Sequence, residues 1–356
     1  MRICLVTHRY PPQSGGVETH VKAVATRFVD RGHDVTVVAA DAGDDGARRE
    51  RRDGVRVRRV RAFAPGDNLY VAPGVVAAVR QCCRSWNPDV VHVHNYHAIP
   101  FALGGLTAAY EAVPVVATPH YHGGSDDTLR DRLLAVYRPL GAATLRRAAA
   151  VLPVGDWERR QLATDFGVEG TVVPNGVVRE RFQSATPAST DRPYLLSVGR
   201  LEAYKGVQHA VAALEVLPEY DLRVAGAGPY RETLAERARA AGVADRVEFL
   251  GYVADERLPG LYAGAAATVA LSTHEAYGLT VGESLAAGTP AVVRTAAALS
   301  DWTGDDGVVG VSEVDPSTVG EAVRTAVDGP APDPTAVPTW AETTDRLLAV
   351  YRDHRD

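Results

Sequence analysis

Short apolar runs alternate with amphipathic helical segments along almost the whole 356-residue chain. The first run, "RICLVT" at 2–7, is followed by the loop "HRYPPQSGG", and from residue 17 apolar side chains recur at helical spacing until Gly32. The next strand is expected at "DVTVVAA", residues 34–40. A strand, a helix and a second strand in this order predict a βαβ unit and hence an α/β chain with a doubly wound parallel sheet.

The alternation is interrupted by a stretch rich in Ser, Thr, Pro and Ala, "QSATPASTDRP" at 183–193. We interpret this stretch as a linker between two Rossmann-like domains, residues 1–185 and 190–338. Ligands of such sheets bind at the carboxyl ends of the strands, so a ligand is expected in a central cleft between the domains. The further strands are expected at 89–94, 113–120, 149–155, 194–200, 220–226, 247–253, 266–273 and 289–295.

Composition excludes several classes of protein. The net charge of -6 means that the chain as a whole lacks the positive charge typical of nucleic-acid-binding proteins. The three cysteines form neither a disulfide framework nor a zinc spacing, which favours a reducing compartment. The apolar run at the amino terminus is too short for a signal peptide, and no apolar stretch approaches the ~20 residues of a transmembrane helix. We therefore expect a cytoplasmic protein, either free or peripheral on the inner face of the membrane.

Eight arginines gather in one stretch of the first half. We interpret it as a solvated hairpin; the alternative is a surface for an anionic partner, such as a membrane or a lipid-linked acceptor. The eight are Arg48, Arg49, Arg51, Arg52, Arg56, Arg58, Arg59 and Arg61.

Two carboxylates stand eight positions apart in "HEAYGLTVGE", residues 274–283. On one helix their alpha carbons would be about 12 Å apart at ~1.5 Å per residue. The acid and base of a glycoside hydrolase need carboxyl groups about 5–9.5 Å apart. Gly278 also disfavours an unbroken helix. We therefore expect Glu275 in a loop and Glu283 in a following helix, each holding a different part of one ligand.

Two cations follow a predicted strand in "SVGRLEAYKG", at Arg200 and Lys205. Lysine occurs only twice among the 38 basic residues, at positions 22 and 205, which suggests a need for a compact charge such as a phosphate site requires. The alternative is an ordinary surface cation. Gly226 and Gly228 in "VAGAGPY" either let the backbone approach a ligand closely or form a tight strand-to-helix turn.

The remaining features complete a nucleotide site. Backbone N–H groups at Gly278 and Leu279, at the start of a helix, can hold a phosphate. Glu283, about one turn further, can accept two hydrogen bonds from vicinal hydroxyls, as Rossmann proteins do with a ribose. Cations, a helix start and an acid that accepts hydrogen bonds from hydroxyls together indicate that the ligand is a nucleotide diphosphate.

In this order the motifs resemble those of the retaining GT-B glycosyltransferases of family GT4. The second half contributes "SVGRLEAYKG", "GAGP" and "EAYGLTVGE…AAGTP". The first half contributes "YPPQSGGVETHV", "ATPHYHG" and "VPNGV". The tail "TWAETTDRLLAVYRDH" resembles the final helix, residues 339–356, that crosses back onto the first domain. The resemblance covers nearly the whole chain and implies a GT-B fold.

The resemblance also implies a role for each site residue. Arg200 and Lys205 neutralise the diphosphate of a nucleotide-diphosphate sugar, Glu275 contacts the donor sugar and Glu283 binds the ribose. No further cofactor is expected, and the acceptor is a hydroxyl of a glycan, a lipid-linked molecule or a small molecule. The implied catalytic residues are His120, Glu275, Arg200 and Lys205. The implied donor-binding residues are Gly15, Gly16, Arg200, Lys205, Gly226, Gly228, Glu275, Gly278, Leu279 and Glu283.

Three departures from the family pattern keep alternatives open. Tyr277 replaces a usual Phe, Ser284 replaces a usual Ala, and "RTAAALSDWTG" after Val293 replaces a Gly-rich stretch that carries an acid. A nucleotide-sugar 2-epimerase and a non-catalytic homologue that binds sugar nucleotides therefore remain as alternatives. A dehydrogenase is disfavoured, because the first loop reads "QSGGVETH" and lacks G-x-G-x-x-G.

Histidines raise the question of a metal. "VHVHNYH" contains His92, His94 and His97, and a second pair is formed by His120 and His122. Such spacing can bind zinc, but no cysteine cluster supports it and no D-x-D motif occurs. We therefore expect a metal-independent enzyme. The segment 123–150 has a mixed Arg and Leu face, which we expect to pack on its own domain; the alternative is a membrane surface.

Overall fold

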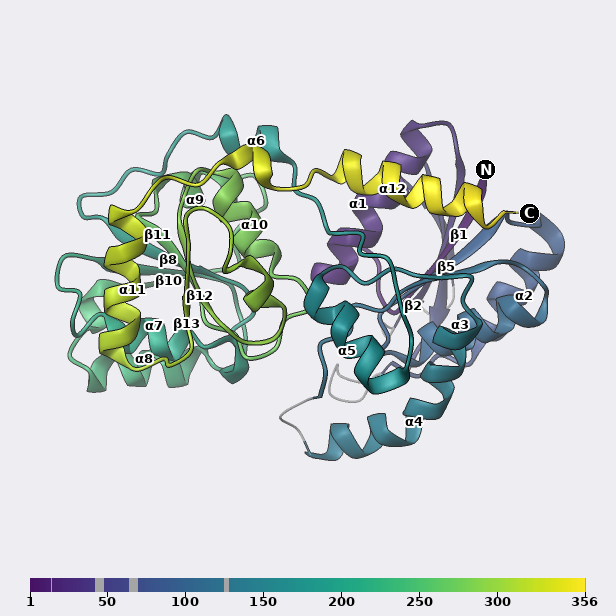
Figure 1. The fold of residues 1–356 in the computed structure, drawn as a ribbon, viewed down its shortest axis with the longest axis horizontal. Coiled ribbons are helices and arrows are strands. Elements are labelled where there is room, and N and C mark those ends of the chain that lie inside the picture. Colours follow the sequence, from purple (N-terminus) through teal and green to yellow (C-terminus); the bar gives the residue numbers. More distant parts are fainter. Residues whose placement is uncertain (14, 42–47, 64–69, 125–127, 356) are drawn as a thin grey trace. The chain divides into compact units, whose positions relative to one another are not determined.

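The computed structural model describes residues 1–13, 15–41, 48–63, 70–124 and 128–355. Its contacts divide the chain into two units. The first comprises Met1–Asn175 together with Trp340–Asp356, and the second comprises Gly176–Thr339. Each unit has one sheet, parallel except for β3 of the first unit, with helices on both faces (Figure 1).

The sheet of the first unit has the strand order β3-β4-β2-β1-β5-β6-β7. All neighbouring strands are parallel except β3, which forms an antiparallel hairpin with β4. Successive strands are therefore added on both sides of β1, with β2 on one side and β5 on the other, as in a doubly wound sheet. The strands are β1 (Arg2–Thr7), β2 (Asp34–Asp41), β3 (Arg48–Arg52), β4 (Val55–Arg61), β5 (Val90–His94), β6 (Val115–Thr118) and β7 (Ala150–Val151).

Helices cover both faces of this sheet. On one face α1 packs against α12, and on the other α2, α3 and α4 pack in series (Figure 1). Alternate residues of β5 divide between these faces: Val91 and Val93 belong to the core beneath α2 and α3, whereas His92 and His94 point the other way. The helices are α1 (Gly16–Asp30), α2 (Gly74–Trp86), α3 (Ile99–Tyr110), α4 (Thr128–Arg147), α5 (Asp156–Phe166) and α12 (Trp340–Asp353).

The sheet of the second unit is parallel throughout, in the order β10-β9-β8-β11-β12-β13. Its strands are β8 (Tyr194–Val198), β9 (Asp221–Ala225), β10 (Val247–Gly251), β11 (Ala267–Ala270), β12 (Ala291–Arg294) and β13 (Val308–Val311). Two apolar cores fill its two faces. Its α-helices are α6 (Arg179–Gln183), α7 (Val207–Ala213), α8 (Arg231–Ala240), α9 (Leu258–Gly264), α10 (Leu279–Ala286) and α11 (Pro316–Asp328).

The division between the units differs from the predicted linker. The first unit ends at Asn175, and helix α6 lies in the second unit, where it packs against α9 and α10. Phe182 of this helix is buried in the second core, which explains why the boundary precedes the Ser/Pro-rich stretch 183–193. The tail returns to the first unit from Trp340, and its helix α12 packs on α1.

The arginine-rich stretch forms the hairpin β3–β4 at the edge of the first sheet. Arg59 is not solvated, however: it is buried, donates to Oε1 of Glu50 at 2.9 and 2.7 Å, and donates to the carbonyl of Tyr10 at 3.2 Å. The predicted hairpin is therefore confirmed, but the prediction that its arginines are solvated is wrong for Arg59, which bonds β4 to the loop after β1.

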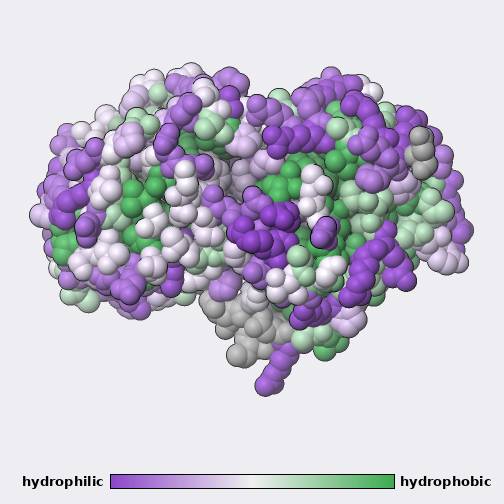
Figure 2. Space-filling model, in the orientation of Figure 1, coloured by the Kyte–Doolittle hydropathy of each residue, from purple (hydrophilic) through white to green (hydrophobic). Residues whose placement is uncertain are grey.

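Helix α4 packs on its own unit through Tyr137, Ala142 and Leu145, as expected, and exposes Leu133 and Val136. No helix within the described ranges is long and apolar enough to span a bilayer. On the face seen in Figure 2, hydrophilic residues predominate and hydrophobic ones show between them on both units.

Candidate functional site

An ion pair joins two strand-end loops of the second unit. Lys205 lies in the 3-10 turn Ala203–Lys205 after β8, and Glu275 lies in the loop between β11 and α10. The ammonium nitrogen is 2.5 Å from Oε1 of Glu275. Burial lowers the pKa of Lys205, but Glu275 and Tyr204 raise it by more, so its pKa lies above the usual value and the group is charged. Lys205 and Glu275, which were predicted separately from the sequence, are therefore in direct contact in the fold.

Backbone contacts hold these two loops together. The carbonyl of Tyr204 accepts from the backbone N–H of Thr273 at 2.9 Å and from Oγ of Ser272 at 3.2 Å. Gly206 has a φ of 74°, and a Cβ there would overlap the carbonyl of Leu271. Arg200, which is exposed, donates to the hydroxyl of Tyr204 at 3.4 Å. Backbone contacts thus fix the two loops from which Lys205 and Glu275 extend.

The glycines after β9 have a structural reason. A Cβ on Gly226 would overlap the carbonyl of Gly199, and one on Gly228 would overlap the carbonyl of Leu201. The backbone N–H of Leu201 donates to the carbonyl of Ala227 at 3.0 Å. The loops after β8 and β9 are therefore packed backbone to backbone. Close approach of two loops of the protein therefore accounts for both glycines, which neither expectation named, and their contact with a ligand stays a prediction.

Helix α10 begins as predicted, with Gly278 as its N-cap and Leu279 as its first residue. Gly278 has a φ of 90°, in the left-handed region that glycine adopts without strain. Glu275 therefore lies in a loop and Glu283 in the helix, which confirms the expected division of the two acids. The first N–H groups of a helix have no partner within it, so this end is suited to an anion.

Glu283 is half-buried on α10 and is oriented by a neighbouring helix. The hydroxyl of Tyr262, on α9, donates to its Oε2 at 2.8 Å. Burial raises the pKa of Glu283 to about 7, although the bond from Tyr262 lowers it in part. Oε2 is thus held by the protein, and no hydrogen bond to Oε1 is found among the described residues.

The sequence that departs from the family pattern forms the 3-10 helix Ala297–Trp302. It packs against the loop that carries Glu275: Nε1 of Trp302 donates to the carbonyl of Tyr277 at 2.6 Å, and the N–H of Ala298 donates to the carbonyl of Glu275 at 3.3 Å. A Cβ on Gly278 would come 2.8 Å from Leu299. This segment therefore supports the helix start. Ser284, another departure, is buried and donates to Thr268 at 2.7 Å.

In the first unit the expected phosphate-contacting glycines open α1. Gly15 is its N-cap and Gly16 its first residue. A Cβ on Gly15 would overlap the carboxylate of Glu18, which is paired with Arg9 at 2.6 Å. The sequence thus places both glycines at a helix start, where an anion is favoured, and Arg9 offsets the acid in the first turn.

His120 lies just beyond β6 and is buried. Its φ of 48° is left-handed, which for a residue other than glycine costs on the order of 1 kcal/mol and is characteristic of functional sites. Burial lowers the pKa of His120 well below its usual value, and the neighbouring His20 adds to this effect. The imidazole is therefore neutral at pH 7 and can exchange hydrogen bonds with a sugar hydroxyl.

The histidines of the two predicted motifs fall into three sets by their contacts. His97 and His122 stack with ring centroids 3.9 Å apart. His92 contacts the hydroxyls of Tyr351 and Thr118 at 2.6 and 2.8 Å. His94 and His120 instead meet His20 of α1, a residue that the strand-based pattern did not include.

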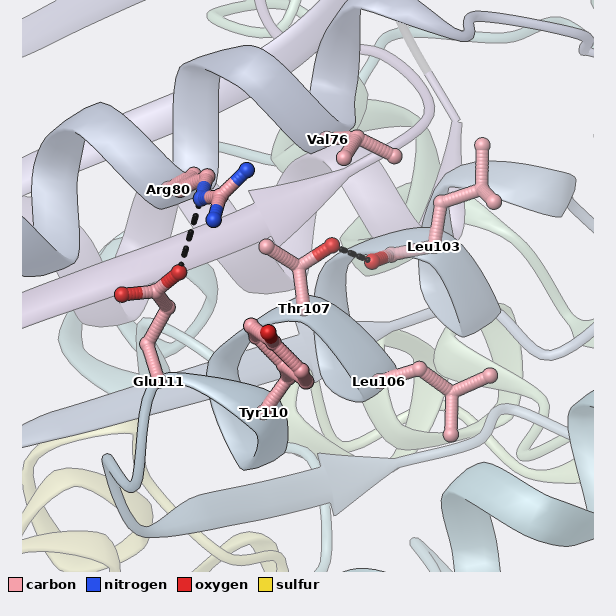
Figure 3. Close-up of a pocket in the computed structure, with 7 residues that line it drawn as sticks. All are labelled: Val76, Arg80, Leu103, Leu106, Thr107, Tyr110 and Glu111. Carbon is pink, nitrogen blue, oxygen red and sulfur yellow. Dashed lines mark hydrogen bonds and ion pairs between the residues drawn. The ribbon is translucent and has the colours of Figure 1, made fainter.

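A shallow depression of about 280 Å³ lies elsewhere on the first unit, between α2 and α3 (Figure 3). Arg80 and Arg84 both bond to the carboxylate of Glu111 at 2.8 Å, so the charges at its edge are paired with one another. None of the predicted site residues lines it. We therefore assign the candidate site to the strand-end loops.

Comparison with known proteins decides the family. The model of "Glycosyltransferase Family 4" matches residues 14–181, and that of "Glycosyl transferases group 1" matches residues 178–334. Glycogen synthase of Mycobacterium tuberculosis is 30% identical over 93% of this chain and 87% of that protein. The chain belongs to the family 4 glycosyltransferases.

Other relatives of this glycosyltransferase have different named substrates. A GDP-mannose-dependent phosphatidylinositol dimannoside mannosyltransferase of Mycobacterium tuberculosis is 29% identical over 93% of this chain and 88% of its own. The solved structure of Anabaena HepE with UDP and glucose aligns with a TM-score of 0.73 at 17% identity, covering 99% and 98% of the two chains. That likeness shows that the glycosyltransferase has the GT-B fold.

Two residues that contact the candidate site residues were not predicted from the sequence. Tyr262 lies in a short helix that carries no motif, and only its spatial position beside Glu283 reveals it. His20 was missed because it looks like an ordinary helix position in the sequence. The stretch "GGVETHV", in which His20 follows a glycine pair by four residues, was the only hint of a site there.

Proposed function

We propose that this glycosyltransferase moves a sugar from a nucleotide-diphosphate sugar to a hydroxyl acceptor, with retention at the anomeric carbon and without a metal ion. The observation that carries the proposal is the contact of Lys205 with Glu275 at the ends of β8 and β11. This contact supports the proposal, because a cation suited to a diphosphate and a carboxylate suited to sugar hydroxyls lie within one hydrogen bond of each other.

The leaving group is the reason for the cations. A nucleotide diphosphate departs with negative charge, so fixed positive groups stabilise the transition state more than the bound donor. Lys205 and the exposed Arg200 supply this charge, and the start of α10 adds backbone N–H groups at Gly278 and Leu279. These groups take the place that a divalent ion occupies in metal-dependent transferases, and no other cofactor is part of the proposal.

The carboxylates hold the neutral parts of the donor. Glu283, with one oxygen already fixed by Tyr262, accepts hydrogen bonds from the ribose hydroxyls. Glu275 accepts from hydroxyls of the transferred sugar, and its departure toward the sugar leaves Lys205 free to face the phosphates. In the first unit, His120 acts on the transferred sugar, while Gly15 and Gly16 present backbone to the donor phosphates.

The named relatives support the choice of donor and acceptor class. The relative from Mycobacterium tuberculosis is named a GDP-mannose-dependent phosphatidylinositol dimannoside mannosyltransferase, and HepE was crystallised with UDP and glucose. We propose a hydroxyl acceptor of the glycan, lipid-linked or small-molecule type. The exposed Leu133 and Val136 on α4 suit contact with a lipid-linked acceptor at a membrane surface.

A thermal-shift screen with UDP, GDP and ADP, followed by a product assay, tests the proposal. A nucleotide diphosphate at 100 times its dissociation constant adds about 2.7 kcal/mol to the free energy of unfolding. The matching sugar nucleotide is then incubated with and without acceptors. Sugar transfer that needs an acceptor supports the proposal; modified sugar and free nucleotide from donor alone would identify an epimerase, and binding without turnover would identify a non-catalytic homologue.

A further inference from the structure

Three buried imidazoles meet on the face of the first sheet that α1 covers. They come from different elements: His20 from α1, His94 from the end of β5 and His120 from the loop after β6. Their ring centroids lie 5.2 Å (His20 to His94), 4.9 Å (His20 to His120) and 5.8 Å (His94 to His120) apart. We propose that these three side chains form a binding site for a transition-metal dication of the zinc class.

The nitrogen atoms carry the proposal. One ring nitrogen from each histidine lies within 4.8 Å of the other two. Nε2 of His20, both ring nitrogens of His94 and Nε2 of His120 are buried and have no hydrogen-bond partner in the described part of the chain. A buried polar atom left unpaired costs about 1–3 kcal/mol, so four of them in one cluster call for a ligand.

A hydrogen bond outside the cluster determines the tautomer of His20. Nδ1 of His20 lies 2.6 Å from Oδ1 of Asn175, an acceptor, so Nδ1 carries the proton and Nε2 keeps a free lone pair. This is the arrangement found behind metal-binding histidines. His92, whose two nitrogens are both engaged, packs beside His94 with ring centroids 4.0 Å apart and is not a ligand.

The geometry suits zinc after a small contraction. Zinc–nitrogen bonds of 2.0–2.1 Å in a tetrahedron place ligand nitrogens roughly 3.4 Å apart, so nitrogens that now lie within 4.8 Å of one another must approach by up to about 1.4 Å. Rotation of the side chains accomplishes this, because His94 has two nitrogens available. Three imidazoles plus a water form a known zinc set, and imidazole favours Zn²⁺, Ni²⁺ or Cu²⁺ over Mg²⁺ or Ca²⁺.

Occupation of the site has a consequence that rests on the proposed function. The metal would bind Nε2 of His120, the residue to which that function assigns the transferred sugar. Zinc therefore inhibits transfer, and a chelator restores it. The metal is not part of the reaction, which agrees with metal-independent chemistry.

Calorimetric titration of the purified chain with ZnCl₂, after removal of metals, tests the site. We expect one Zn²⁺ per chain, and Co²⁺ in its place should show the visible absorption of a tetrahedral complex. His94→Ala and His20→Ala should weaken binding by more than the 10–100-fold typical of losing an outer partner, and Asn175→Ala by about that amount. His97→Ala, a buried histidine of the same unit outside the cluster, is the matched control and should bind as the wild type does.

The wild-type titration alone can overturn the proposal. Absence of stoichiometric binding, or a Co²⁺ spectrum of octahedral type, contradicts a three-histidine site even if every variant misfolds. Equal binding by His94→Ala and the His97→Ala control contradicts it as well. Transfer assayed separately keeps the two claims apart: zinc bound without inhibition refutes the assigned role of His120, and a chain that binds zinc but never transfers sugar refutes the proposed function alone.

Discussion

The ammonium nitrogen of Lys205 lies 2.5 Å from Oε1 of Glu275, so an ion pair joins the loops after β8 and β11. About a fifth of each side chain is exposed, at 21% and 23%. A pair in this setting is oriented by the protein yet accessible to a ligand. The proposed function requires both properties, because each partner must turn to a different part of the donor.

Removal of the cation should weaken donor binding and transfer. Lys205→Met should lower kcat/KM by about 10–100-fold, the size expected for a hydrogen bond to a charged group worth about 1.5–3 kcal/mol. Lys22→Met is the matched control, since Lys22 is exposed on α1 and is the other lysine of the chain. A Lys205→Met enzyme as active as the control would contradict the diphosphate role.

The pKa of Glu283, about 7, predicts a pH dependence of nucleotide binding. The carboxylate is the form that accepts hydroxyl hydrogen bonds, so affinity for nucleotide diphosphate should rise as the pH increases through 7. Binding at pH 7 should release on the order of half a proton from this group. Calorimetric titration in two buffers of different ionisation enthalpy measures the number of protons released.

Glu283→Gln provides the control for that measurement. The variant should bind more weakly and lack this proton release, while any contribution from the nucleotide's own phosphate stays the same in both proteins. An unchanged dissociation constant and an unchanged proton count in the variant would rule out the ribose role.

A graded set of glycine substitutions tests the helix start. Gly278→Ala should lower the free energy of unfolding by about 2 kcal/mol, because it combines a φ of 90° with a Cβ 2.8 Å from Leu299. Gly288→Ala, with a φ of 75° and open space, should lose about 1 kcal/mol. Gly304→Ala has neither constraint and should change little. Denaturant unfolding that ranks the three otherwise would show that the start of α10 is not so constrained.

His120 should affect transfer without affecting nucleotide binding. His120→Asn keeps a residue that tolerates the left-handed φ of 48° but removes the imidazole. Nucleotide diphosphate affinity should be unchanged, and the transfer rate at saturating donor should fall by up to ~100-fold, since misplacement of about 1 Å costs that much. A normal rate in a folded variant refutes the sugar contact, and weakened nucleotide affinity refutes the division of roles.

The repeated strand–helix alternation was enough to predict most of the fold. Strands at 2–7 and 34–40 match β1 and β2 closely. The strand expected at 149–155 shrinks to Ala150–Val151, because Pro153 has no N–H to donate to the ladder. Strand β13, Val308–Val311, was not predicted, since four residues between turns give little periodicity.

The site was predictable where local sequence determines it. A glycine before an apolar run predicts the start of α10, and the loop and helix positions of Glu275 and Glu283 follow. Contacts between distant elements were not predictable. The bond from Tyr262 to Glu283 and the approach of His20 to His120 depend on how α9 and α1 pack on their sheets.

One assay tests the central claim most directly: sugar incorporated into acceptor and nucleotide diphosphate released, measured together in excess EDTA. For enzyme first freed of bound zinc, we expect equal amounts of the two products, dependence on the acceptor, and the same rate with and without chelator, because Arg200 and Lys205 supply the charge that a metal would provide. Release of nucleotide regardless of acceptor, or activity lost in EDTA and restored by one added metal, would contradict it.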